Sequence, residues 1–223
     1  MKIERERKFS ISDSRNIIPR FYELSFVDGY ERKIGWGDRV SGAKYEDIYF
    51  DTGDFHLLNI GASYRARRFV DQNHSRHKEE FSGVTFTFKT KFSGDEREEI
   101  TDRIDDNSYS AFNLRDSSLN SARRAREILG NRGLREIIKL MTERRTIDFS
   151  DGENEFEVAL DYLTYLHSGG EVIDSEWMIE VEQTAGTANE FARFSDSIGV
   201  IYGGSRINHN KYAAGVRLMQ RKA

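Results

Sequence analysis

The chain has 223 residues, of which 37% are hydrophobic, enough to bury one substantial core, so we expect a single domain over residues 1–223. Its 34 Lys and Arg against 38 Asp and Glu leave a net charge of −4, which gives no reason to expect nucleic acid as a partner, and the lack of cysteine excludes disulfides, thiolate metal sites and thiol catalysis. No apolar run approaches the roughly 20 residues of a membrane-spanning helix and the N-terminus shows no apolar signal-peptide core, so we expect a soluble cytoplasmic protein without a membrane partner.

The chain opens with a charged strand. Residues 3–9 alternate so that Glu4, Glu6 and Lys8 share one face, because successive side chains of a strand point to opposite sides. Residues 12–24 then show capping residues and apolar positions at helical spacing, which predicts a helix whose regular part begins near Pro19. Residues 28–43 are rich in Gly and charge and predict a loop.

The middle of the chain predicts strands separated by turns. Residues 134–149 fit either a helix or a strand, and the Asp151-Gly152 turn signal favours a strand at least over 141–149. The segments that predict strands are 44–51, 61–70, 83–92, 97–100, 141–149, 153–164 and 174–183. The segments that predict helices after the first are 121–129 and 187–198. In total we expect roughly eight strands with three or four helices.

Three other segments predict no regular element. His74 and His77 lie in a polar loop. Their spacing would bring them together on a helix, but the surrounding residues predict no helix, so we do not predict a metal site there. Residues 105–120 are rich in Asp, Asn and Ser and predict a loop, with a short helix inside it as the alternative. The tail 203–223 is assigned no element.

Several later strands repeat the alternation of the first. Their polar faces carry charges of mainly one sign, as in Arg65-x-Arg67, Lys89-x-Lys91 and Glu180-x-Glu182. Such faces are either the wet outside of a sandwich or the lining of a barrel whose apolar faces are covered by helices. A site for a polyanion and its metal would require some strands with positive side chains and others with negative side chains. The pattern alone leaves both arrangements open.

The motifs together resemble the CYTH, or triphosphate tunnel metalloenzyme, family. Its Glu-x-Glu-x-Lys signature stands here as Glu4, Glu6 and Lys8. The further matches, in the family's order, are Tyr49-Phe50-Asp51-Thr52, Arg65-x-Arg67, Lys89-x-Lys91, Arg97-Glu98, Arg145, Asp161, Glu180-x-Glu182 and Lys211-Tyr212. The resemblance implies an α+β fold, an eight-stranded antiparallel β-barrel with a polar lumen and helices packed outside. Of Glu143-Arg144-Arg145, only Arg145 matches the family's Lys-x-Arg.

The resemblance also implies roles for these residues. The residues expected to bind the polyanion are Lys8, Arg65, Arg67, Lys89, Lys91, Arg145 and Lys211. The residues expected to hold Mg²⁺ or Mn²⁺ are Glu4, Glu6, Glu180 and Glu182. The residues expected to act in catalysis are Glu4, Glu6, Lys8, Glu98 and Asp161. Two alternatives stay open: Glu98 could be a structural partner of Arg97 or Lys91 with Glu99 on the other face, and Lys211 could simply cap the barrel.

The function implied is metal-dependent hydrolysis of a triphosphate, whether inorganic triphosphate, a nucleoside triphosphate or another organic triphosphate. A class IV adenylate cyclase and a non-catalytic module that binds polyphosphate or nucleotide are the alternatives. Hydrolysis is favoured because it needs only the phosphate clamp and metal, whereas a cyclase must also seat an adenine. Both Glu-x-Glu pairs argue against a pure anion binder. We expect a triphosphate-containing small molecule as ligand, and a monomer or homodimer.

Overall fold

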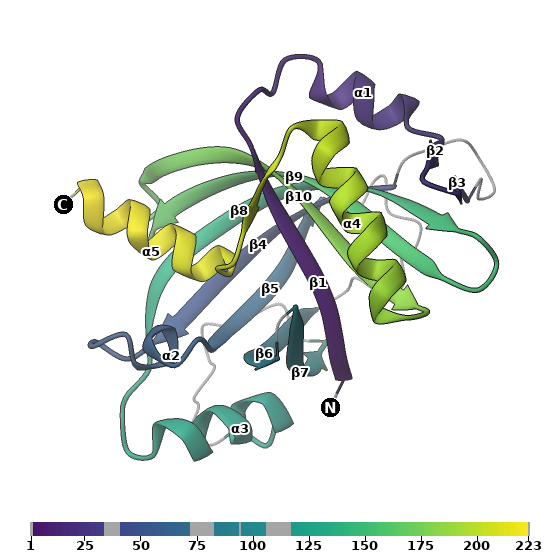
Figure 1. Cartoon of the computed structure of the whole chain (residues 1–223). Coiled ribbons are helices and arrows are strands. Elements are labelled where there is room, and N and C mark those ends of the chain that lie inside the picture. The colour runs from purple at the N-terminus through teal and green to yellow at the C-terminus, as the bar shows by residue number, and fades with distance from the viewer. Residues whose placement is uncertain (1, 34–40, 72–82, 94, 106–116, 223) are drawn as a thin grey trace.

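A computed structural model describes residues 2–33, 41–71, 83–93, 95–105 and 117–222 (Figure 1). Its main feature is a closed antiparallel barrel of eight long strands. These are β1 Lys2–Ile11, β4 Ser41–Asp51, β5 Ser63–Asp71, β6 Val84–Ser93, β7 Glu96–Ile104, β8 Arg135–Ser150, β9 Glu155–His167 and β10 Val172–Ala185. Neighbouring strands follow the order β8-β4-β5-β6-β7-β1-β10-β9, and the pairing of β9 with β8 closes the ring. The predicted barrel is therefore confirmed.

Helices and short strands surround this barrel. The described helices are α1 Ile17–Glu23, α2 His56–Asn59, α3 Asn120–Leu129, α4 Ala188–Tyr202 and α5 Lys211–Lys222. The short strands are β2 Phe26–Val27, β3 Tyr30–Arg32 and β11 Ser205–Ile207. The β2–β3 hairpin extends the sheet beyond β8, and β11 pairs with β1.

Most elements lie where the sequence predicts them. Pro19 lies in the first turn of α1, where the backbone N–H that proline lacks would have no partner within the helix. One expectation was wrong, because the segment 28–43 is not all loop: Tyr30–Arg32 forms β3. The tail, to which the sequence pattern assigned no element, contains β11 and α5. His74, His77 and residues 106–116 lie outside the described residues, so the loop expectations there stay predictions.

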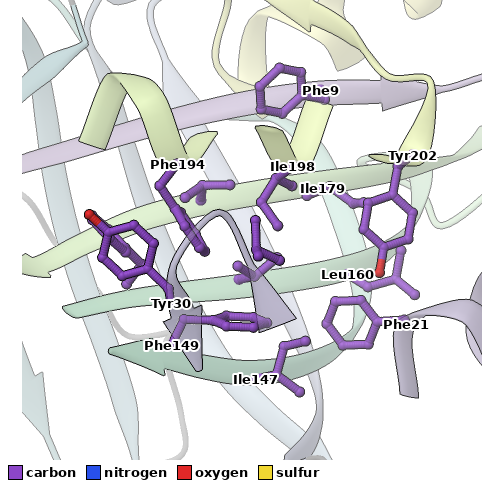
Figure 2. Packing of buried hydrophobic residues seen from close by; sticks show 14 of the residues in the cluster. Phe9, Phe21, Tyr30, Ile147, Phe149, Leu160, Ile179, Phe194, Ile198 and Tyr202 are labelled. Atoms are coloured by element: carbon purple, nitrogen blue, oxygen red, sulfur yellow. The ribbon is translucent and has the colours of Figure 1, made fainter. Parts of the chain in front are cut away.

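The outward faces of the strands form the hydrophobic core, which lies between the barrel and its helices. One cluster joins β1, β8, β9 and β10 to α1 and α4 and includes Phe194 of α4 (Figure 2). The Phe194 ring stacks on Phe156, with ring centroids 4.3 Å apart, and packs against Phe149. A second cluster joins β4, β5 and β6 to α3. The apolar faces are thus turned outward under helices, and the polar faces are turned inward.

Helix α5 packs differently, against inward-facing residues. Its Tyr212 and Val216 share a cluster with Leu163 and Met178, which lie two positions from Asp161 and Glu180 and therefore face the same side of their strands. The approach is close at Gly215, where an added Cβ would stand 2.6 Å from Cδ1 of Ile138. Helix α5 therefore fills one end of the barrel and brings its first residues to the interior.

We expect Phe194→Ala to lower the free energy of unfolding by about 3–5 kcal/mol, because it leaves a cavity in the cluster under α4. Denaturant unfolding followed by circular dichroism measures the change. Val200→Ala, on the same helix but 82% exposed, should change it by less than about 0.5 kcal/mol. Equal losses in the two variants would contradict this packing.

Candidate functional site

The inward faces of the strands enclose a cavity of about 240 Å³. Charged side chains dominate its lining and come from six strands and from the start of α5. The residues that line it are Glu4, Glu6, Lys8, Tyr49, Ser63, Arg65, Arg67, Thr87, Lys89, Glu99, Arg144, Glu180, Glu182, Asn210 and Lys211. Acidic and basic side chains therefore meet across one enclosure, since barrel closure brings strands distant in the sequence together.

One basic wall is the pair Arg65 and Arg67 of β5. The Arg67 guanidinium donates Nε–H to Oδ1 of Asp47 at 2.6 Å and Nη2–H to Oδ2 at 2.8 Å, while Arg65 Nη1 lies 3.2 Å from Oδ2. Asp47 is completely buried, and although burial alone would raise its pKa, the two guanidiniums lower that pKa to about 2. The Arg67 guanidinium also lies 3.7 Å from the centroid of the Tyr45 ring. Both arginine head groups are therefore fixed from behind.

A second basic pair combines Arg144 of β8 with Lys211 of α5. Arg144 donates two hydrogen bonds to the carboxylate of Asp161, at 2.8 and 2.7 Å, and Lys211 Nζ donates to Oδ2 of Asp161 at 2.7 Å. Lys211 Nζ also lies 2.8 Å from Oε2 of Glu180. Burial opposes ionisation of Asp161, yet Arg144 and Lys211 hold the pKa of its carboxyl below the usual value. Asp161 thus positions this pair as Asp47 positions the first.

The third charged group surrounds Lys89 and Lys8. Lys89 contacts Glu4 and lies 2.8 Å from Glu99, while Lys8 pairs with Glu6. Burial and the nearby carboxylates of Glu6 and Glu99 outweigh Lys89 and raise the pKa of Glu4 to about 7. Burial also acts to raise the pKa of Glu99, but the attraction of the Lys89 ammonium is larger and lowers that pKa to about 2. Among these three carboxyls, the pKa is thus raised at Glu4, while the lysines keep the pKa values of Glu6 and Glu99 below their usual range.

The structure brings most of the predicted site residues together. The predicted residues that line the cavity are Glu4, Glu6, Lys8, Arg65, Arg67, Lys89, Glu180, Glu182 and Lys211. Asp161 lies behind two of them, in contact with Arg144 and Lys211.

Besides Asp161, three predicted residues do not line the cavity. Arg144 takes the place expected of Arg145, which shares its strand face with the core residue Ile147. Glu99 likewise lines the cavity, while Glu98 approaches Arg124 of α3 at 3.9 Å. Lys91 follows Lys89 near the end of β6 and is exposed.

Sequence reasoning missed several polar residues of the site. The most important is Asp47, which alternates with Tyr49 on the inward face of β4 and could have been found by the same period of two. No sequence pattern predicts Asn210 as a lining residue, because its place in the cavity depends on how α5 packs into the barrel.

The carboxylates that line the cavity are of the chemical type that binds hard divalent cations. Such cations take oxygen ligands, and Glu6 lies directly opposite Glu182 in the β1–β10 register, where like charges destabilise each other. The described part of the chain contains no group of three or more His, Asp or Glu already arranged to hold a metal. Glu4, Glu6 and Glu180 instead contact lysines. The residues therefore suit a cation, provided that the carboxylates exchange partners.

Comparisons with known proteins agree with this architecture. The model of the CYTH domain family matches residues 2–200. A candidate adenylate cyclase from Bacillus halodurans has a similar structure, with a TM-score of 0.61 and 22% identity over 95% of this chain and 97% of that one. A candidate adenylyl cyclase from Hippeastrum with a dominant triphosphatase activity has a TM-score of 0.54 and 15% identity, over 97% of this chain and 96% of that one. No curated protein matches the sequence.

None of the described helices is long and apolar enough to cross a membrane.

We expect Asp47→Asn to lower the free energy of unfolding at pH 7 by about 2–4 kcal/mol, because it leaves two buried guanidiniums without their shared partner. The folded-state pKa is depressed, so the contribution of Asp47 is complete above about pH 4 and is lost as the pH falls toward 2. Urea unfolding at pH 7 and pH 3 should therefore show a smaller difference between variant and parent at pH 3.

The matched control for this change is Glu155→Gln, which removes an exposed ion pair with Lys33 and should cost less than about 1 kcal/mol. A difference that is constant with pH would contradict the role assigned to Asp47.

Proposed function

This chain belongs to the CYTH domain family, and we propose that it is a metal-dependent triphosphatase that hydrolyses a phosphoanhydride bond. The candidate substrates are inorganic triphosphate, a nucleoside triphosphate and another organic triphosphate. One observation carries the proposal: two cationic pairs, each fixed by a buried aspartate, face a cavity that carboxylates also line. A linear polyanion with a divalent cation has the charge pattern that such a cavity complements.

The cationic side chains are suited to grip successive phosphoryl groups. Arg65, Arg67 and Arg144 present planar forks that match phosphate oxygens, whereas Lys8 and Lys89 act as point charges. The volume of about 240 Å³ lies below the roughly 300–1,000 Å³ typical of pockets for drug-sized ligands. The cavity therefore suits the phosphate chain, with any organic group left outside it.

The carboxylates of Glu4, Glu6, Glu180 and Glu182 are the candidates to hold Mg²⁺ or Mn²⁺. The bound cation would supply neutralisation of charge on the phosphoryl oxygens. The protein's own part is to hold the substrate in line for attack by water, whose oxygen bonds to phosphorus as the bridging P–O bond breaks. Positioning and charge neutralisation suffice for this chemistry, and no covalent nucleophile is required.

Hydrolysis is favoured over cyclisation by the lining of the cavity. Among the described residues that line it, the one aromatic side chain is Tyr49. Its ring is stacked on Tyr212, with centroids 5.3 Å apart and an interplanar angle of 14°. That face of the ring is thus covered, which leaves less aromatic surface to seat an adenine.

We expect the purified protein to release phosphate from at least one of inorganic triphosphate, ATP and thiamine triphosphate with Mg²⁺ or Mn²⁺, and to release none with EDTA. A malachite-green assay measures the phosphate. Cyclic AMP from ATP, detected by chromatography, would identify a cyclase instead. Binding without any turnover would identify a binding module.

Arg144→Gln should lower kcat/KM by about 10–100-fold, as expected for the loss of a charge-assisted contact to phosphate. Arg145→Gln, the adjacent change on the opposite strand face, should stay within about threefold of the parent. Steady-state kinetics on the best substrate of the panel measures both, after circular dichroism has verified folding. A larger loss in Arg145→Gln would contradict the assignment.

A further inference from the structure

The described residues that line the cavity leave almost no cationic side chain without a carboxylate partner. Each of its cations contacts a carboxylate: Lys8 contacts Glu6, Lys89 contacts Glu4 and Glu99, Arg65 and Arg67 contact Asp47, and Arg144 and Lys211 contact Asp161 and Glu180. With Glu182 included, the described lining and its two buried aspartates present six cationic and seven acidic side chains. A polyanion that enters alone therefore meets a site whose charges are already balanced.

The carboxylates fall into two groups by position. Asp47 and Asp161 are completely buried behind the arginines and are not part of the cavity lining, so they can keep their bonds when a ligand binds. Glu4, Glu6 and Glu99 line the cavity directly and contact its lysine ammonium groups. A phosphate that binds Lys8 or Lys89 therefore competes with these glutamates for the same ammonium groups.

Displaced glutamates would be costly, because a buried carboxylate that loses its ion-pair partner is strongly destabilising. Glu4 and Glu6 are each only 6% exposed, so water cannot fully replace the lysine. The register that sets Glu6 opposite Glu182 adds repulsion once the lysine is engaged elsewhere. A divalent cation that arrives with the polyanion would supply the missing positive charge.

We propose that polyanion and divalent cation bind to this cavity as a coupled pair, with the lining glutamates passing from lysine to the cation as phosphate takes the lysines. This inference rests on the proposed function, since it assumes that the ligand is a triphosphate. Coupling is reciprocal, so each ligand must raise the affinity for the other by the same factor. Lys8 and Lys89 are the side chains that change partner, whereas the arginines keep their bonds to the buried aspartates.

The test is titration calorimetry at pH 7.5 with imidotriphosphate, an analogue whose P–N–P bridges resist hydrolysis. We expect the parent protein to bind it at least tenfold more weakly in EDTA than in Mg²⁺. Glu6→Gln removes the charge that competes for Lys8, and should bind the analogue at least threefold more tightly than the parent in EDTA while gaining less from Mg²⁺. Glu99→Gln removes a carboxylate that contacts Lys89 and should also bind the analogue more tightly than the parent in EDTA. It replaces Glu6→Gln in the test if that variant does not fold.

The matched control is Glu98→Gln, which removes the same charge one residue away, outside the cavity lining, and should leave both affinities within twofold of the parent. Equal affinity of the parent with and without Mg²⁺ would overturn the coupling and leave the triphosphatase proposal intact. Weaker binding in EDTA by both glutamine variants would also overturn the coupling. An absence of binding under either condition would overturn both proposals.

Discussion

The pairing of opposite charges inside a closed barrel is the constraint on which the rest of this structure depends. Charges taken out of water are tolerated only when they are paired and hydrogen bonded. Here buried aspartates receive arginine forks, and lysines lie between glutamates. Such pairs do little for net stability, because the desolvation of both partners offsets their attraction. Their effect is to hold the side chains in one arrangement.

Stability must therefore come from another part of the molecule. The apolar faces of the strands point away from the barrel axis and are covered by α1 and α4 on one side and by α3 on another. This reverses the usual arrangement of a small barrel, in which apolar side chains fill the interior. The outer helices stabilise the barrel, and the interior is left for polar chemistry.

Helix α5 connects the two regions. Its apolar residues extend the core into one end of the barrel, and its first residue, Lys211, reaches Asp161 and Glu180 in the cavity. The bond from Tyr212 to Asp51, at 2.8 Å, ties the helix to the end of β4. The position of Lys211 thus depends on packing contacts of a helix that the sequence pattern did not predict.

The sequence by itself determined which strand faces are charged and which are apolar, because alternation with a period of two follows from backbone geometry. That was enough to predict most strands and, with the family resemblance, nine residues that line the cavity, from Glu4 to Lys211. The resemblance selected Arg145 and Glu98, whereas Arg144 and Glu99 line the cavity, since a shift of one residue reverses every side chain and only strand pairing sets the register. The sequence also did not reveal Asp47 as the partner of both β5 arginines. Only the tertiary structure decided these points, because closing the barrel is what brings residues of distant strands within the range of a hydrogen bond.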